Sequence, residues 1–199
     1  MSTSKRRKRL YHHGDLRTAI LAAAGQLLEK KGIEALSLRE VARRAGVSHN
    51  APYRHFPSRE SLLAALAAEG FGRFREQLEA AERSGGLRAR GEAYVGFALA
   101  HPQRFRIMFG SGSWLAGDSG LRDAARRAFG GLEQAIAAHA GQAAPHAAIA
   151  AWALVHGLSH LLLDQHLADA QRRAPQLEEF VRAVLGSIRF AVAPAQTSA

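Results

Sequence analysis

The segment SLREVARRAGVSHNAPYRHF, residues 37–56, restricts the fold more than any other part of the sequence. Ser37 and Glu40 stand three residues apart, as in a capping box, and predict the start of a short helix. Gly46 predicts its end, because glycine readily adopts the left-handed backbone that closes a helix. A second short pattern then runs to Pro57. Two short helices joined by a tight glycine turn form a helix-turn-helix unit.

The start of the second helix depends on Pro52, which has no backbone N–H. With Ser48 as the N-cap, Pro52 would be the fourth helical residue, where the missing donor costs a hydrogen bond. With Asn50 as the N-cap, Pro52 lies in the first turn and costs little. We therefore expect a late or 3₁₀-like start.

The rest of the chain also shows helical periodicity, and no segment alternates convincingly with period two. Between Asp15 and Gly32, apolar residues recur at spacings of three and four positions, which predicts an amphipathic helix. The stretch Ser84-Gly85-Gly86 predicts a break and a hinge between front and back. The sequence predicts an all-α fold of about nine helices. Beyond the first three, which end at Gly32, Gly46 and Pro57, the expected ranges are about 58–83, 87–100, 103–110, 119–140, 145–167 and 175–192.

The formal net charge is +10 and lies mostly at the front of the chain. Residues 1–60 hold 13 Lys and Arg against 5 Asp and Glu, whereas the remainder holds 14 against 12. A basic front indicates a polyanionic partner, either nucleic acid or an anionic membrane, although a basic face can also serve solubility alone. The absence of cysteine excludes disulfides and Cys-ligated zinc and fits a reducing cytoplasm.

The N-terminus does not resemble a secretory signal, because YHHGDL follows the basic run KRRKR where an apolar stretch would be needed. Residues 1–13 are expected to form a disordered basic arm. We expect that no apolar run is long enough to span a bilayer and that the protein has no membrane partner.

The second helix of a helix-turn-helix unit enters the DNA major groove by its N-terminal end. Small and polar residues there let the backbone approach, and Asn50 and His49 can bond to base edges. Hydroxyl, guanidinium and imidazole groups further along suit phosphate oxygens, which position the protein without reading sequence. The predicted DNA-binding residues are Ser37, Arg39, Ser48, His49, Asn50, Ala51, Tyr53, Arg54, His55 and Arg59. The basic arm can add sequence-independent affinity. For Tyr53 the alternative is ordinary packing against the first helix.

The stretch GIEALSLREVARRAGVSHNAPYRHFPSRESLLAAL and the preceding LRTAILAAAGQLLEKKG resemble the DNA-binding region of TetR-family transcriptional regulators, over roughly residues 14–70. The resemblance implies that Tyr53 and His55 contact phosphates and that Phe56 locks the recognition helix into the core. It departs from the family at Pro52, where a leucine-like residue is usual.

The back half, in FALAHPQRFRIMFG and AWALVHGLSHLLLD, resembles the C-terminal part of a TetR subgroup named for a Trp-His-Gly signature. Such a domain dimerises and often holds a small-molecule pocket. The implied domains are a helix-turn-helix domain at 14–72 (motif about 37–56) and a C-terminal regulatory and dimerisation domain at 73–199. Candidate pocket residues are Phe97, Phe105, Met108, Phe109, Trp114, Trp152, His156 and His160, with ordinary core packing as the alternative. Asp164 could partner the histidines.

A homodimer is expected to form through the last two helices. Residues 147–163 are apolar nearly all round, which predicts burial on most sides, and 175–192 carries one apolar stripe. Ala153 and Gly157, one turn apart, would let a second helix approach closely. The alternative is that both helices complete the monomer core.

These observations indicate a homodimeric repressor, released from a palindromic operator on double-stranded DNA by a small-molecule effector. It would be cytoplasmic, at the nucleoid when bound to DNA, and need no cofactor or metal. Two alternatives remain open. His156 and His160 have the spacing of two metal ligands, without the glutamate of HExxH, which would suit a metal- or small-molecule-handling enzyme. A non-specific DNA-coating protein could rely on the arm alone. No nucleophile motif, phosphate loop or carboxylate pair supports an enzyme.

Overall fold

The computed structural model describes residues 13–110, 118–140, 144–171 and 176–187, and every regular element in these ranges is a helix, which confirms the all-α prediction. Residues 1–12 of the expected arm and Trp114 lie outside them. The elements, in chain order, are α1 (His13–Lys31), α2 (Leu38–Ala45), the 3₁₀ turn η1 (Pro52–Arg54), α3 (Arg59–Ala100), α4 (Pro102–Phe109), α6 (Ser119–Ala140), α7 (Ala144–Leu163), α8 (Ala168–Gln171) and α9 (Leu177–Gly186).

The helix α2 is fixed by its two ends. The Ser37 hydroxyl accepts the backbone N–H of Glu40 at 3.2 Å, and Gly46 ends the helix at φ 69°. The capping box is only half formed, because the Glu40 carboxylate binds Arg43 at 2.6 and 2.8 Å. The inner face of α2 is buried, with Val41 fully enclosed.

The expected second helix of the motif is a single 3₁₀ turn with Pro52 in its first turn. This confirms the late, 3₁₀-like start. Ser48 and Asn50 are both wrong as N-caps, because Ala51 takes that place without a side-chain bond. Local bonds from Ala51 N to Ser48 O at 3.0 Å and from Phe56 N to Pro52 O at 2.9 Å close the turns instead. The missing N–H of Pro52 therefore costs no helical bond.

The label α3 covers two helical halves, because Gly86 interrupts it with φ 69° and ψ −161°. Phe74 and Tyr94 stack edge to face with ring centroids 4.9 Å apart, whereas twenty residues of straight helix would span about 30 Å. The chain therefore folds back at Gly86, and the predicted break is confirmed. The reversal forms a helical hairpin within the C-terminal part of the chain. The prediction of a hinge between the front and the back of the chain is therefore wrong.

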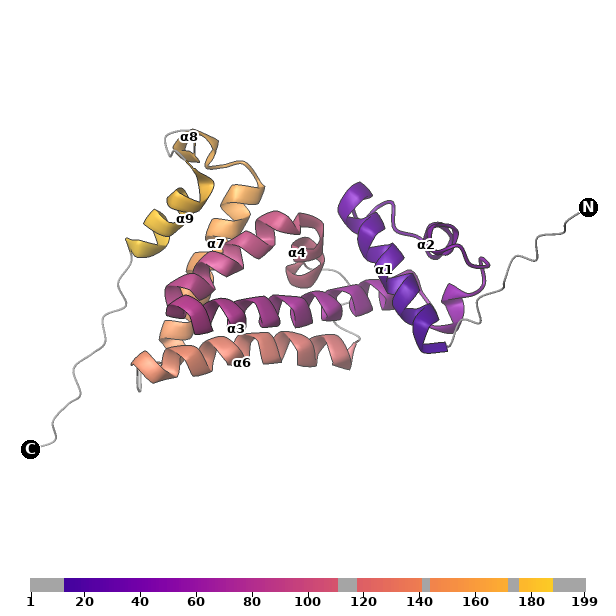
Figure 1. The fold of residues 1–199 in the computed structure, drawn as a ribbon, viewed down its shortest axis with the longest axis horizontal. Coiled ribbons are helices and arrows are strands. Elements are labelled where there is room, and N and C mark those ends of the chain that lie inside the picture. Colours follow the sequence, from indigo (N-terminus) through magenta and orange to yellow (C-terminus); the bar gives the residue numbers. More distant parts are fainter. Residues whose placement is uncertain (1–12, 111–117, 141–143, 172–175, 188–199) are drawn as a thin grey trace, which may run out of the picture.

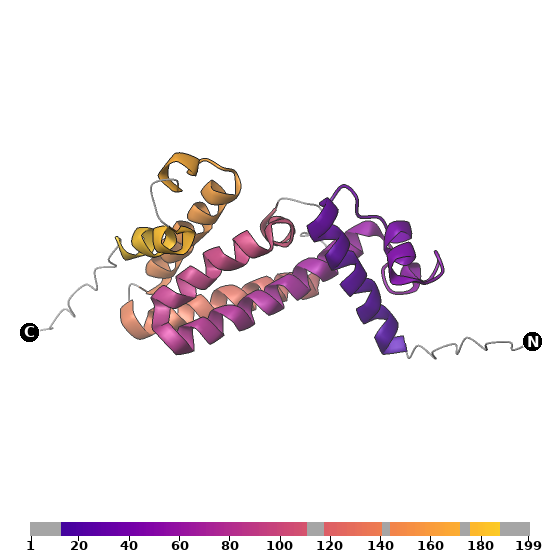
Figure 2. The ribbon, with the colours of Figure 1, turned by 45° about the horizontal axis from the view of Figure 1, so that its top comes forward.

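The molecule is elongated, with α1, α2 and η1 at one end and α7, α8 and α9 at the other (Figures 1 and 2). The first half of α3 runs between these ends, α6 lies along it, and α4 sits between α3 and α1. One continuous apolar core extends from Ile20 of α1 through Leu66 and Phe105 to Val181 of α9.

The helix α7 is less buried than its composition predicted. Its segment His146–Leu163 has a mean hydropathy of 1.4 and is, by length and composition alone, apolar enough to cross a membrane, which corrects our reading of the sequence. Only 28% of that segment is buried within the chain, and Ile149 and Leu161 are 54% and 43% exposed.

Candidate functional site

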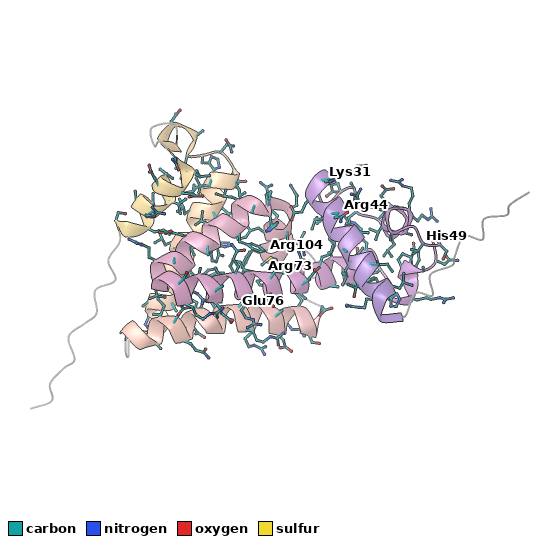
Figure 3. All side chains as sticks on the ribbon, in the orientation of Figure 1. Lys31, Arg44, His49, Arg73, Glu76 and Arg104 are labelled. Atoms are coloured by element: carbon teal, nitrogen blue, oxygen red, sulfur yellow. The ribbon has the colours of Figure 1, made fainter. Side chains whose placement is uncertain are left out.

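The turn before η1 presents the side chains expected to read bases. Ser48, His49 and Asn50 are all exposed, and Ala51 is half-buried behind them. His49 lies at the free end of the molecule, away from the C-terminal helices (Figure 3). Small and polar groups at an exposed helical start leave room for close approach of a duplex.

The η1 turn itself separates exposed from buried side chains. Tyr53 is 46% exposed and Arg54 is exposed, while Phe56 is 2% exposed. His55 is half-buried, with its ring 6.5 Å from that of Phe56. The Arg17 guanidinium of α1 lies 5.3 Å from the Phe56 ring centroid, a cation–π contact that ties the turn to α1. Phe56 thus anchors the segment that displays Tyr53 and Arg54.

The predicted DNA contacts on either side of the turn differ in whether their side chains are already engaged in hydrogen bonds within the chain. Arg39 is exposed at the start of α2, whereas the Ser37 hydroxyl is occupied as the helix cap. Arg59 donates from Nε to Leu36 O at 2.8 Å and from Nη2 to Ile33 O at 2.6 Å. Two of its nitrogens thus hold the loop between α1 and α2, which sequence reasoning did not anticipate.

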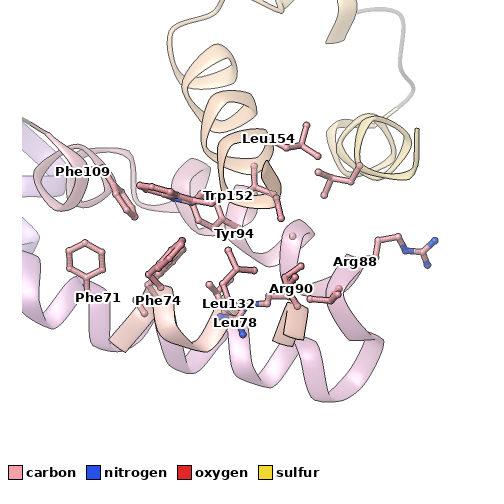
Figure 4. A pocket seen from close by; sticks show the side chains of 18 of the residues that line it. Phe71, Phe74, Leu78, Arg88, Arg90, Tyr94, Phe109, Leu132, Trp152 and Leu154 are labelled. Atoms are coloured by element: carbon pink, nitrogen blue, oxygen red, sulfur yellow. The ribbon is translucent and has the colours of Figure 1, made fainter. Parts of the chain in front are cut away.

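A second candidate site is a cavity of about 690 Å³ between the two halves of α3 and helices α4, α6, α7 and α9. Figure 4 shows the rings of Phe71, Phe74 and Phe109 on one side and Tyr94 below Trp152 in the middle. The lining also includes Leu78, Leu87, Arg88, Arg90, Gly91, Met108, Ala125, Ala128, Phe129, Leu132, Ile136, Ala151, Leu154, Val155, Leu185 and Gly186. Its size and apolar walls are those of a small-molecule site.

Three of the predicted pocket residues, Met108, Phe109 and Trp152, line this cavity. Phe97 and Phe105 are absent from the lining and are 1% and 0% exposed, so they belong to the core. The sequence reasoning missed the walls from α6 and the first half of α3, because the fold-back at Gly86 brings them together.

The predicted pocket residues His156 and His160 are not part of the cavity lining, and His156 is hydrogen-bonded to Tyr94. Trp152 Nε1 donates to Tyr94 Oη at 3.2 Å, and Tyr94 Oη lies 2.8 Å from His156 Nδ1. Burial raises the pKa of the Tyr94 phenol, so it remains a neutral donor. The His160 ring lies 4.7 Å from that of His156. Asp164 is not their partner, because it pairs with Arg106 at 3.0 Å.

Burial, and secondarily the charge of His160, lowers the pKa of His156, so the neutral ring is favoured and can accept from Tyr94. Because the folded-state pKa lies below the unfolded one, protonation favours unfolding. We expect wild-type stability to fall as pH decreases from about 6.5 through that lowered pKa. The variant His156→Asn, which keeps an acceptor, should lose less over the same range. Thermal unfolding between pH 7.5 and 5 measures the difference, and parallel curves for the two proteins would contradict it.

Metal binding gains no support from this region. Among the residues whose placement is described, no three His, Asp or Glu side chains lie close enough to hold a metal ion.

Comparison with known families gives two matches. Residues 20–66 match the family described as bacterial regulatory proteins, tetR family, and residues 87–188 match the tetracyclin repressor-like C-terminal domain. A comparison with curated proteins found no match.

Solved structures agree with these matches. A protein of unknown function from Rhodococcus sp. RHA1 is 36% identical, with 90% of this chain and 96% of that one covered and a TM-score of 0.74. The regulatory protein SCO4313 is 25% identical, with 87% and 95% covered and a TM-score of 0.71. A TetR-family transcriptional regulator from Rhodococcus sp. is 25% identical, with 87% and 96% covered and a TM-score of 0.56. Since the C-terminal match alone spans half of the chain, and a second match covers the helix-turn-helix segment, the chain belongs to the TetR family of bacterial transcriptional regulators.

Proposed function

We propose that this DNA-binding regulator is a homodimeric repressor that leaves a palindromic operator when a small molecule enters the cavity. One observation supports the coupling most directly: a single helix half joins the two sites. Arg59, in the first turn of α3, holds the carbonyls of Ile33 and Leu36. Further along the same half, Phe71 and Phe74 line the cavity. A shift of α3 at the cavity would therefore move the DNA-binding end.

The thermodynamic requirement is differential binding. A ligand releases DNA only if it binds the conformation with unsuitable spacing of the two recognition segments more tightly than the DNA-bound one. A ligand must first have a site to bind, and the cavity provides one, because its aromatic walls can bury a small apolar molecule.

For the DNA complex we propose two classes of contact. Phosphate contacts come from Arg39, Tyr53, Arg54 and His55, and base contacts come from His49 and Asn50, with Ser48 and Ala51 allowing close approach. Exposure of Tyr53 and Arg54 beside the buried Phe56 supports this division. Ser37 and Arg59 contribute by positioning the segment, as their hydrogen bonds indicate.

The homodimer is proposed to form through α7 and α9. The exposed apolar side chains Ile149 and Leu161 of α7 and Leu177 of α9, at 54%, 43% and 42%, support this surface. A symmetric pair of two helices per protomer would cover them. The domain boundary is proposed near residue 72, within the first half of α3. We further propose that the protein acts in the cytoplasm, by binding alone, without catalysis or a cofactor.

The test is selection of bound duplexes from a random DNA pool at two salt concentrations. The wild type is expected to enrich a palindrome, as two symmetry-related segments require. Tyr53→Ala should weaken binding to that duplex about tenfold or more, because one phosphate contact per protomer is lost. Its stability should change little at this exposed position.

The matched control is Tyr53→Phe, which removes the hydroxyl and keeps the ring. A loss in both variants assigns the effect to the hydroxyl, whereas a loss in Tyr53→Ala alone assigns it to packing. Enrichment of no motif, with weak and salt-sensitive binding equal in all three proteins, would favour the non-specific DNA-coating alternative and reject the repressor.

A further inference from the structure

The cavity contains one buried cation whose hydrogen bonds are incomplete. Arg90 is 3% exposed and lines the cavity, and its Nη1 binds Glu82 Oε2 at 2.6 Å. Its Nη2 is also buried and has no hydrogen-bond partner. A buried guanidinium nitrogen without an acceptor is costly, so such a group calls for an explanation. We propose that Arg90 binds the carboxylate of an amphipathic monoanionic effector whose apolar body lies along the aromatic wall.

The charges of the lining favour an anion. Its only ionisable side chains among the described residues are Arg88, Arg90 and Tyr94, and no carboxylate is among them. Tyr94 stays neutral, since burial raises its pKa. Arg88 is 67% exposed at its side chain and points away from the cavity (Figure 4). Arg90 is therefore the group that can meet a buried anion.

The number of free donors indicates a monoanion. Glu82 already takes Nη1 and compensates part of the charge, while the two N–H groups of Nη2 have no acceptor. A dianionic phosphate would need several donors on more than one side, whereas a carboxylate is well satisfied by the N–H groups of one charged nitrogen. The opposite side of the cavity, at Phe71, Phe74 and Phe109, offers only aromatic surface. The ligand class is thus an acid with an apolar tail or ring.

Two adjacent glycines of α6 define the space beside this nitrogen. A Cβ built on Gly131 would lie 3.2 Å from Arg90 Nη2, whereas a Cβ on Gly130 meets nothing within 4 Å. The missing side chain at Gly131 therefore lets Nη2 lie close to α6, and a methyl group added there would crowd this nitrogen. Since both lie inside α6, alanine at either position should favour the helix.

The inference rests on the proposed use of the cavity as an effector site, and the experiment separates the two. Calorimetry on the full chain measures binding of octanoate, methyl octanoate and octylammonium, which share the tail and differ in head-group charge. Octanoate is expected to bind about tenfold tighter than the ester, and octylammonium more weakly than both. Binding of all three with equal affinity overturns the role of Arg90 and leaves an apolar effector cavity. Binding of none contradicts the effector cavity itself.

Two pairs of variants locate the effect. Arg90→Met should reduce the preference for octanoate over the ester below threefold. Arg75→Met, which breaks the pair of Arg75 with Glu79 at 2.8 Å in the first half of α3, should preserve that preference. Gly131→Ala should weaken the binding of octanoate, whereas Gly130→Ala should not, and both variants retain Arg90. If Arg90→Met fails to fold, the glycine pair decides: equal octanoate affinity in Gly130→Ala and Gly131→Ala overturns the proposal.

Discussion

Phe56→Ala is expected to abolish operator binding and to lower the free energy of unfolding by about 3–5 kcal/mol, as removal of a fully buried phenylalanine does. The side chain is 2% exposed in the core shared by α1, α2 and the start of α3. It also receives the Arg17 guanidinium on its ring. Because it lies two residues after the end of η1, its loss frees the turn that displays Tyr53 and Arg54. Urea unfolding and titration of the selected duplex measure the two effects.

The contrast with Tyr53 makes this prediction specific. Two aromatic side chains stand three positions apart, one exposed and one buried. Tyr53→Ala should lose DNA affinity and keep stability, whereas Phe56→Ala should lose both. Phe56→Leu fills most of the volume and should recover most of the stability. Wild-type DNA affinity in Phe56→Ala would show that the turn needs no anchor.

The local features of the DNA-binding end could be predicted because their causes are local. Ser37 caps α2 with its hydroxyl, and Gly46 ends the helix with its left-handed backbone. The missing N–H of Pro52 is enough to predict a late start of the second helix of the motif, and η1 begins at this residue. The N-cap itself was missed because tertiary anchoring by Phe56, which no short-range pattern reveals, makes a capping side chain unnecessary.

The cavity was harder to predict because its walls come from distant segments. Met108 and Trp152 lie in the two segments whose resemblance to the family implies a pocket, but Phe74 and Tyr94 meet only after the chain reverses at Gly86. A signal for Arg90 did exist. It stands four residues before Tyr94, on the stripe that continues to Phe97 and Ala98, and an arginine on an apolar stripe needs a partner.

The burial of α7 could not be derived from one chain. Its composition predicts a helix enclosed on most sides, and only 28% of its most apolar window is enclosed. A partner surface would remove the discrepancy, since hydropathy registers burial without saying which chain provides it.

The buried Arg104 of α4 carries the second large effect, because it joins the DNA-binding end to the rest of the molecule. It lies between α1 and the helices beyond (Figure 3). Its backbone N–H donates to Glu29 Oε1 of α1 at 3.2 Å. Its Nη1 lies 3.4 Å from both Leu66 O and Glu69 Oε2 of α3. A Cβ on Gly25 would lie 2.6 Å from its Nη2, so α1 approaches the guanidinium directly.

Arg104→Met should therefore lower the free energy of unfolding by about 2–4 kcal/mol. The Leu66 carbonyl and the Glu69 carboxylate of α3 lose a charged donor, and the Glu29 carboxylate of α1 loses the guanidinium whose Nε lies 3.9 Å away. Arg106→Met is the matched control on the same helix. Arg106 also binds one carboxylate, that of Asp164 at 3.0 Å, but its side chain is 51% exposed. An exposed pair of this kind contributes about 0–1 kcal/mol. Urea unfolding compares the two variants. Equal losses in the free energy of unfolding would mean that the buried Arg104 contributes no more than an exposed ion pair does.

The same variant also probes the link between the sites. Arg104 and Met108 lie one helical turn apart on α4. Met108 lines the cavity, while the Arg104 guanidinium pairs with Glu29 of α1, with Nε 3.9 Å from Oε1. In a variant that still folds, DNA binding without ligand should persist, because the η1 segment keeps its own anchor at Phe56. Octanoate at saturating concentration should then release less DNA than from the wild type. Full release from Arg104→Met would place the coupling in α3 alone, through Arg59 and its bonds to the loop after α1.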